Sequence, residues 1–290
     1  MSAFAKINLG LRILGNRADG YHELDTFFLQ IDLADQLHFK KTSSAGLTLT
    51  CDQPEIPVDE SNLCYRAYQL IREVAAKPLN VSLHLEKKIP AGAGLGGGSS
   101  DAAVTLMALN RFFELNLPTA RLLQLATQLG SDVPFFLTGG MCRGRGRGEI
   151  LEAIEDLPAF WVLLVTPPVA VSTAWAYQNY NKLGLTKTEK YRKLPSSNIL
   201  HCTGVELLEV CQNDLEAAVF EKYEELAKIK AQLQSSGAMV SSMTGSGSAM
   251  FGLFRTRQEA QEQAKIFEHG STFVAKPIRW GIRQVYQMQY

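Results

Sequence analysis

Hydrophobic and polar residues alternate along the N-terminal segment of the chain. The apolar positions are Ile7, Leu9, Leu11 and Ile13, and they alternate with Lys6, Asn8, Gly10 and Arg12. A period of two is typical of a β-strand with one buried face. We therefore predict a strand here, with Lys6 and Asn8 side by side on its other face. Asp19-Gly20 marks a turn, and residues 21–31 resume an extended pattern.

The rest of the chain predicts a mixture of strands and helices, which places the protein in the α/β class, as an α+β two-layer architecture. The predicted strands are 81–85, 160–165, 239–243 and 249–254. The predicted helices are 62–74, 102–113, 119–129, a long one over about 205–234, and one that begins at the Thr256–Glu259 capping box and ends at Gly270. Residues 181–197 are polar and weakly patterned.

The length of the chain indicates two domains. Its 290 residues are many for a single hydrophobic core. A boundary near residues 152–158 divides the chain into domains of residues 1–154 and 155–290, and we expect the last residues to pack back on the first domain.

Composition limits the possible partners. The 29 basic and 29 acidic residues balance, so nothing favours nucleic acid or an anionic membrane. The longest apolar run, residues 159–165, is too short to cross a bilayer, and Lys6 interrupts any signal-peptide core. Five cysteines without C-x-x-C spacing indicate reduced thiols in a cytoplasm rather than disulfides or a zinc site. Nothing in the pattern indicates an oligomeric state.

One basic run offers an alternative partner. Arg143-Gly144-Arg145-Gly146-Arg147-Gly148 has the form of an RNA-binding RGG segment. Three arginines inside a folded chain more often form a tight connection near phosphate or solvent, and we therefore expect no nucleic acid partner.

A glycine-rich loop is the strongest chemical signal. Residues 90–101 read Pro-Ala-Gly-Ala-Gly-Leu-Gly-Gly-Gly-Ser-Ser-Asp and lie between the predicted strand 81–85 and the predicted helix 102–113. Free backbone N–H groups, the positive end of the helix dipole and the lack of Cβ atoms suit an anion. Ser99, Ser100 and Asp101 are candidate N-caps. A branched side chain at Gly97 is expected to face the anion.

Other glycine-loop families do not fit. A dinucleotide fold requires a second strand after the helix, but residues 116–119 lead into another helix. A P-loop requires a Lys before the Ser, and none lies between Lys88 and Arg111. The protein-kinase signatures H-R-D and D-F-G are absent from the sequence. What remains is a loop that binds phosphate through backbone amides.

Three separated motifs together resemble the GHMP small-molecule kinases: residues 5–9 (Ala-Lys-Ile-Asn-Leu), 90–102, and 244–247 (Thr-Gly-Ser-Gly). Residues 19–24, 131–136 and 213–216 resemble further motifs of one branch of this family and occur in the same order as in that branch, which acts on a cytidine diphosphate-linked methylerythritol. The resemblance covers essentially the whole chain. It implies a two-domain fold with an inter-domain active site. It also implies ATP-dependent phosphorylation of the substrate 2-hydroxyl in non-mevalonate isoprenoid precursor synthesis, and we expect Mg²⁺ to accompany the ATP.

Two other functions remain open. One is a GHMP kinase for homoserine, mevalonate or a sugar, and the other is a non-catalytic nucleotide or metabolite sensor. Tyr21 and His22 favour a cytidine-bearing substrate, and the presence of both Lys6 and Asp132 favours catalysis.

The resemblance also implies roles for individual residues. On the sequence alone, Asp132 is equally a catalytic base or an N-cap for residues 133–137; the resemblance implies the base, with Lys6 as ionic partner. No acidic residue follows the loop at the spacing of a magnesium ligand, so no metal ligand is assigned, and Trp175 is expected to shape the substrate mouth. The implied ATP-binding residues are Asn62, Leu63, Lys87, Pro90, Ala91, Gly92, Ala93, Gly94, Leu95, Gly96, Gly97, Gly98, Ser99 and Ser100. The implied substrate-binding residues are Asn8, Tyr21, His22, Thr173, Tyr177, Gly245, Ser246 and Gly247.

Overall fold

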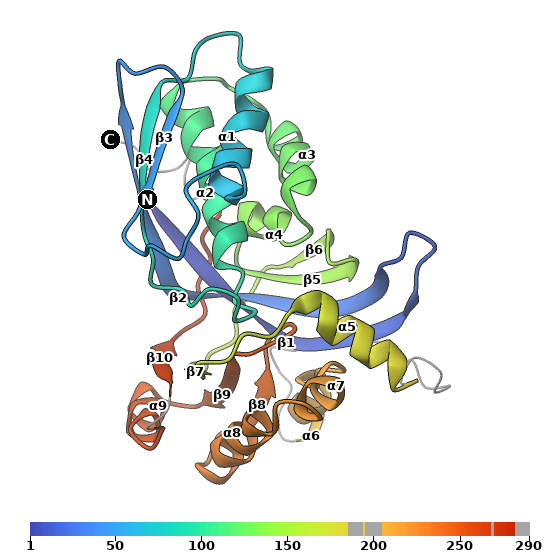
Figure 1. Ribbon diagram of the computed structural model, residues 1–290. Coiled ribbons are helices and arrows are strands. Elements are labelled where there is room, and N and C mark those ends of the chain that lie inside the picture. Colours follow the sequence, from blue (N-terminus) through green and yellow to red (C-terminus); the bar gives the residue numbers. More distant parts are fainter. Residues whose placement is uncertain (185–193, 195–204, 268–269, 282–290) are drawn as a thin grey trace.

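The chain forms two β-sheets with helices packed on them, as Figure 1 shows for the computed structural model. The structure describes residues 1–184, 194, 205–267 and 270–281. The strands are β1 (Ser2–Asn16), β2 (His22–Lys41), β3 (Leu47–Cys51), β4 (Val81–Glu86), β5 (Met141–Gly146), β6 (Ile150–Ile154), β7 (Trp161–Thr166), β8 (Val240–Met243), β9 (Met250–Phe254) and β10 (Ser271–Ala275). The helices are α1 (Leu63–Val74), α2 (Gly97–Phe112), α3 (Thr119–Leu129), α4 (Val133–Thr138), α5 (Thr173–Lys182), α6 (Val205–Val210), α7 (Glu216–Phe220), α8 (Glu224–Ser235) and α9 (Arg257–Ala264).

The first sheet has the order β3-β4-β2-β5-β6, and β1 also pairs with β2. The long strand β2 therefore binds β1, β4 and β5 along different parts of its length. Helices α1–α4 pack on one face of this sheet in a shared apolar core. The predicted strand 81–85 and the predicted helices 62–74 and 119–129 are confirmed.

Strand β1 is buried on both faces, so the prediction of a single buried face is wrong. Its apolar residues Ile7 and Leu9 share a core with Val162 and Phe251 of the second sheet. On the opposite face, Lys6 and Asn8 are only 4% and 3% exposed. Strict alternation gave the correct faces, but it could not show that both are covered, because the covering segments are distant in the sequence.

The second sheet has the order β10-β7-β9-β8 and packs against helices that include α5, α7, α8 and α9. The strands predicted over 160–165, 239–243 and 249–254 are confirmed. The capping box is also confirmed, since Thr256 and Glu259 exchange both hydrogen bonds, but the helix ends at Ala264 rather than at Gly270.

The single helix predicted over 205–234 is wrong, because three helices, α6, α7 and α8, occupy this range. The chain leaves the helical path between α6 and α7 to pair with β1. Leu11 donates its backbone N–H to Gln212 O, and Asp214 donates its own to Leu11 O. These long-range bonds replace intrahelical ones, which a local helical pattern cannot reveal.

The end of the described chain returns to the first sheet. Asp32 N–H donates to Lys276 O, Ile278 N–H donates to Gln30 O, and the Trp280 ring packs edge-on against Phe4. The polar stretch 181–197 lies mostly outside the described residues, as do residues 282–290. Among the described helices, none is long and apolar enough to cross a membrane.

Candidate active site

A cleft of about 990 Å³ brings together most of the predicted site residues. Its walls come from β1, the β1–β2 hairpin, the glycine loop, the start of α4, helix α5 and the turn between β8 and β9. Ser100 and Gly247 are the predicted site residues that do not line it. Ser100 is 1% exposed, and a Cβ at Gly247 would lie 2.7 Å from Met243 Sδ, so both are packed against the protein.

Lys6, Asn8 and Asp132 form a polar cluster on the floor of the cleft. Lys6 Nζ donates to Asn8 Oδ1 at 2.6 Å and lies 3.5 Å from Asp132 Oδ2. Asn8 is held in turn, because its Nδ2 donates to Thr26 Oγ1 at 2.8 Å. The Lys6 ammonium also lies 5.5 Å from the centre of the Phe28 ring. These contacts leave the ammonium few other positions.

Irregularities in the β1–β2 pairing flank this cluster. The register shifts between Phe4 and Lys6 and again between Asn8 and Gly10. Bulges of this kind re-aim side chains and are frequent beside active sites. Here they bracket the segment that carries Lys6 and Asn8, and the sequence gave no sign of them.

Asp132 occupies the N-cap position of α4 but makes no capping hydrogen bond. The predicted N-cap position is therefore confirmed, but the carboxylate does not cap the helix. Its side chain is 33% exposed in the cleft, whereas that of Lys6 is 5% exposed. The carboxylate is thus free to reach a bound ligand while the Lys6 ammonium orients it.

The glycine loop turns through three left-handed residues, Gly92, Gly94 and Gly96, with φ of 67°, 79° and 71°. Helix α2 begins at Gly97, and Gly96 is its N-cap without a side-chain bond, so the prediction of Ser99, Ser100 or Asp101 as N-cap is wrong. A Cβ at Gly94 would lie 2.4 Å from Thr244 O. Only glycine permits this approach of the loop to the β8–β9 turn.

Gly97 lines the cleft, but a side chain there would pack against the protein. A Cβ there would lie 3.1 Å from Ile89 Cγ2 and 3.5 Å from Asp35 Oδ2. The expectation that a branched side chain at Gly97 would meet the anion is therefore wrong, because the helical backbone points that position towards the base of the loop.

A buried ion cluster joins the two ends of the glycine loop. The Lys87 ammonium donates to Asp101 Oδ2 at 2.5 Å and to Asp35 Oδ2. Asp35 also accepts from the N–H groups of Lys88 and Ile89. Burial raises the pKa of Asp101, and its Oδ1 has no hydrogen-bond partner. Burial lowers the pKa of Lys87, but the charges of Asp101 and Asp35 reverse this and leave it raised.

Lys87 borders the cleft, but its charge is committed to the carboxylates of this cluster. The ammonium therefore supports the loop rather than facing a ligand. On the same side, Asn62 caps α1 by accepting from Cys64 N–H and donates to Pro57 O. Ile56, Pro57, Leu63 and Ile89 complete a mainly apolar wall.

The other end of the cleft is aromatic. His22 stacks on Tyr177 with ring centroids 4.8 Å apart, and its Nε2 lies 2.9 Å from Asn181 Oδ1. Burial raises the pKa of Tyr177, which keeps the phenol neutral. Tyr21 is 56% exposed, and the Arg147 guanidinium lies 4.8 Å from its ring centre.

The β8–β9 turn lines the cleft beside the glycine loop. Asn8 donates its backbone N–H to Thr244 Oγ1 at 2.9 Å, and Ser246 Oγ lies 2.8 Å from Thr173 Oγ1. A Cβ at Gly245 would lie 3.5 Å from Lys6 Nζ, so the turn passes directly over the Lys6–Asn8 pair. The three separated motifs therefore converge at this point.

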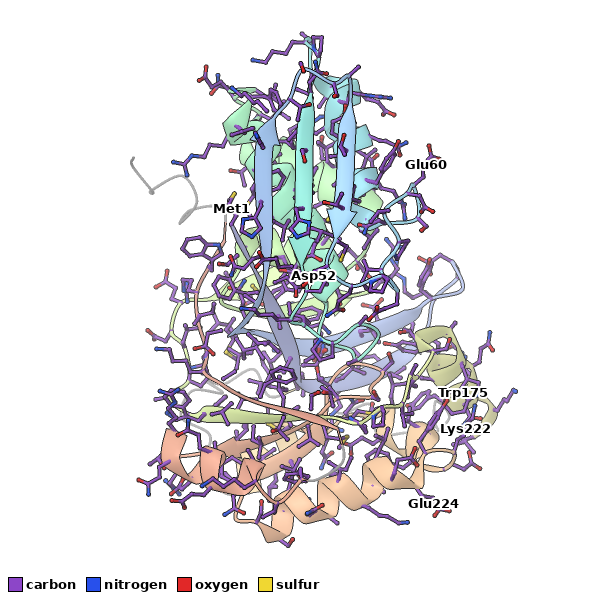
Figure 2. The ribbon with its side chains drawn as sticks, turned by 60° about the vertical axis from the view of Figure 1, so that its left-hand side comes forward. Met1, Asp52, Glu60, Trp175, Lys222 and Glu224 are labelled. Atoms are coloured by element: carbon purple, nitrogen blue, oxygen red, sulfur yellow. The ribbon has the colours of Figure 1, made fainter. Side chains whose placement is uncertain are left out.

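Trp175 lies outside the cleft, so the expectation that it shapes the substrate mouth is wrong. Figure 2 shows Trp175 beside Lys222 at the outer surface, and Lys222 Nζ lies 4.7 Å from the indole ring centre. Trp175 also packs edge-on against Tyr223. Helix α5 turns Thr173 and Tyr177 inwards, and Trp175 falls on its other side.

Several lining residues were missed by the sequence analysis. Arg147, Gln178 and Asn181 line the aromatic end, and Thr26 and Phe28 lie beneath the polar cluster. Arg147 belongs to the arginine run, which is strand β5 followed by a turn rather than an extended tail. Arg143 of the same run is 8% exposed and pairs with Asp25. Spacing from Tyr177 at i+4 was the available signal for Asn181.

Family models match both halves of the chain. The model of the GHMP kinases N-terminal domain matches residues 62–140, and that of the GHMP kinases C-terminal matches residues 203–271. The chain is 42% identical over 280 residues to a 4-diphosphocytidyl-2-C-methyl-D-erythritol kinase of Chlorobium phaeobacteroides, covering 96% of this chain and 97% of the relative. It is 38% identical to the enzyme of the same name from Citrifermentans bemidjiense, covering 95% and 94%.

Solved structures agree with these sequence matches. A crystal structure of 4-(cytidine 5'-diphospho)-2C-methyl-D-erythritol kinase superposes with a TM-score of 0.81 at 36% identity, covering 97% of this chain and 99% of that chain. Methanococcus jannaschii mevalonate kinase superposes with a TM-score of 0.74 at 14% identity, covering 96% and 98%. The second similarity is one of fold alone.

Proposed function

We propose that this chain, which belongs to the 4-diphosphocytidyl-2-C-methyl-D-erythritol kinase family within the GHMP kinases, transfers the γ-phosphoryl group of ATP to the 2-hydroxyl of that cytidine-linked alcohol. The reaction is a step of non-mevalonate isoprenoid precursor synthesis. The observation that most supports it is the Lys6–Asp132 pair, 3.5 Å apart, between the glycine loop and the aromatic end of the cleft.

In this proposal the glycine loop holds the ATP phosphates. Backbone N–H groups and the first turn of α2 present partial positive charge to the β- and γ-phosphates without a lysine of the P-loop kind. The Asp35–Lys87–Asp101 cluster keeps both ends of the loop in place. The apolar wall near Leu63 accommodates the adenine.

The polar cluster performs the transfer. Asp132 accepts the proton of the substrate 2-hydroxyl while the hydroxyl oxygen bonds to the γ-phosphorus of ATP. The bond between the γ-phosphorus and the bridging oxygen breaks, and its electrons leave with ADP. Lys6 offsets the negative charge of the moving phosphoryl group. Asn8 keeps Lys6 on the axis between the two substrates, since its Oδ1 accepts from Nζ at 2.6 Å.

Magnesium enters with the nucleotide in this scheme. Among residues 1–184, 194, 205–267 and 270–281, no group of three or more His, Cys, Asp or Glu side chains could hold a metal ion. Asp35 and Asp101 share the Lys87 ammonium, and Asp132 is the carboxylate left open to the cleft. This donor set fits an ion bound chiefly by ATP phosphates and water, as Mg²⁺ prefers.

The aromatic end selects the cytidine in our proposal. The Tyr21 and Tyr177 rings offer stacking surfaces for a pyrimidine, and His22 offers a polar edge. Asn181 orients the His22 ring through its contact with Nε2. Because a base bound here would be remote from the transferred phosphoryl group, this end contributes mainly to substrate binding.

We also assign residues 1–154 and 155–290 to separate domains, which the change of sheet between β6 and β7 supports. The return of residues 276–281 to β2 fits this division. We place the enzyme in the cytoplasm, since the thiols of Cys51, Cys64 and Cys142 are free.

A coupled ADP-release assay tests the function. The protein is given Mg-ATP with the cytidine-linked alcohol, homoserine or mevalonate in parallel, and the product of the first reaction is analysed for phosphate on the 2-hydroxyl. We expect ADP release with the cytidine-linked alcohol alone. ADP release with homoserine or mevalonate instead would contradict the proposal, as would ATP binding without turnover on any of the three.

A further inference from the structure

The motif Asn213-Asp214-Leu215-Glu216 has no role in the mechanism described above, yet its polar side chains are fully engaged. Its segment joins α6 to α7 and lies between β1 and the β8–β9 turn. Asn213 is only 5% exposed. Because burying an amide without partners is costly, its contacts show what the segment holds.

Asn213 holds the β8–β9 turn with both hydrogens of its amide. Nδ2 donates to Met243 O at 2.8 Å and to Gly245 O at 2.7 Å. The amide oxygen accepts from Leu215 N–H at 3.0 Å, which sets the orientation of the amide. The Asn213 side chain thus binds the backbone carbonyls of the residues before and after Thr244.

Thr244 connects the turn to the other two motifs. Its hydroxyl accepts from the Asn8 backbone N–H at 2.9 Å and donates to Gly94 O at 3.4 Å. One hydroxyl therefore touches both the strand that carries Lys6 and the glycine loop. Its position depends on the backbone of the turn, and Asn213 holds that backbone from behind.

The rest of the motif fastens the same segment to β1 and to β8. Asp214 Oδ2 accepts from Ile13 N–H at 2.8 Å, and Asp214 Oδ1 lies 3.0 Å from an Arg12 nitrogen. Glu216 Oε1 accepts from Met243 N–H at 2.8 Å. The segment therefore links the first sheet to the second at the point where the cleft closes.

We propose that Asn213 is a positioning residue for phosphoryl transfer, holding the Gly245 backbone against the Lys6–Asn8 pair. The inference rests on the proposed function. Gly245 packs so closely that a Cβ there would lie 3.4 Å from Asn8 Oδ1 and 3.5 Å from Lys6 Nζ. Movement of the turn changes the space around the ammonium, and misplacement of a catalytic group by about 1 Å costs on the order of 100-fold in rate.

The substitution Asn213→Asp tests this role. It keeps the size of the side chain and the acceptor for Leu215 N–H, but it sets a carboxylate oxygen against two carbonyl oxygens. We expect kcat with the cytidine-linked alcohol to fall by about 10- to 100-fold. The dissociation constant of ATP, measured by calorimetry with a non-hydrolysable analogue, is expected to change less than about threefold, because the glycine loop keeps its own anchors.

Asn110→Asp is the matched control. Asn110 is 2% exposed and donates to Leu117 O at the far end of α2, away from the cleft. Both variants are assayed below their melting temperatures. A kcat loss in Asn213→Asp that Asn110→Asp does not share supports the inference. An equal loss in both, or a kcat for Asn213→Asp within about threefold of wild type, overturns it.

A second variant covers a failure of Asn213→Asp to fold. Thr244→Val keeps the shape of the side chain and removes the hydroxyl between Asn8 N–H and Gly94 O, so kcat should fall by several-fold with the ATP dissociation constant retained. Unchanged kcat in this variant overturns the inference. Wild-type protein in the same assay separates the two proposals: no turnover of the alcohol rejects the function and the inference together, whereas wild-type turnover with unaffected variants rejects the inference alone.

Discussion

Replacing Gly94 by alanine should disconnect the glycine loop from the β8–β9 turn. Gly94 has φ of 79°, and a Cβ there would lie 2.4 Å from Thr244 O and 3.2 Å from Gly247 O. Both neighbours are backbone atoms, so no side chain can rotate away. The loop or the turn must move by several tenths of an ångström at the least.

The size of the effect follows from two terms. A left-handed conformation costs alanine about 1–2 kcal/mol more than glycine. Overpacking against the turn adds about 1–3 kcal/mol. We therefore expect Gly94→Ala to lose about 2–5 kcal/mol in the free energy of unfolding, measured by denaturant titration. Because the moved segments carry the phosphate site and the cover over Lys6, kcat should fall by about 100-fold as well.

Gly92→Ala measures the conformational cost of a left-handed alanine without the overpacking. Gly92 has a similar φ of 67°, but a Cβ there would meet nothing within 4 Å. We expect this variant to lose only the conformational cost of about 1–2 kcal/mol. Equal losses of stability in the two variants would refute the argument that the loop and the turn are held in contact at Gly94.

Three further substitutions address the remaining parts of the site. Asp132→Asn should lower kcat by about 10²- to 10⁴-fold and leave ATP binding intact, and near-normal turnover in the folded variant would remove Asp132 from the mechanism. Tyr21→Ala should weaken binding of the cytidine-linked alcohol by about 1–3 kcal/mol, seen mainly as a higher KM; an unchanged KM would contradict stacking on Tyr21. Lys87→Met should destabilise the fold by about 3–5 kcal/mol in thermal or chemical unfolding at neutral pH, since it leaves Asp35 and Asp101 buried without their cation; retention of wild-type stability would show that the ion cluster does not anchor the loop.

Local patterns in the sequence gave a large part of the fold. The alternation at residues 7–13, the helical pattern at residues 62–74 and the capping box at Thr256 each depend on neighbouring residues, and each lies in the expected element. The expected GHMP kinase fold is confirmed by the family models and by the superposed crystal structure, and the structure adds its two sheets. The single helix predicted over 205–234 was wrong for a non-local reason, because its interruption at Asn213 depends on pairing with β1, which is distant in the sequence.

The candidate site divides in the same way. The residue types of the glycine loop and of the Lys6–Asn8 segment were readable, because glycine freedom and a period of two are properties of the chain itself. The distance of 3.5 Å between Lys6 and Asp132 could not be predicted from the sequence, and neither could the bulges that aim Lys6 into the cleft. Trp175 shows the limit most clearly, since its place in α5 was near Tyr177 in sequence but its side chain packs on Tyr223 outside the cleft.

By itself, the sequence determined the chemistry available: a glycine loop ahead of a helix, a lysine and an asparagine on one strand face, and an aspartate that could act as a base or as an N-cap. The tertiary structure alone decided how these groups meet. Lys87 pairs with two buried carboxylates, and Ser100 and Gly247 lie outside the cleft lining. Asn213 holds the turn that passes over Lys6. The physical reason is that charge pairing, burial and close backbone approach depend on segments that meet only after the two sheets pack together.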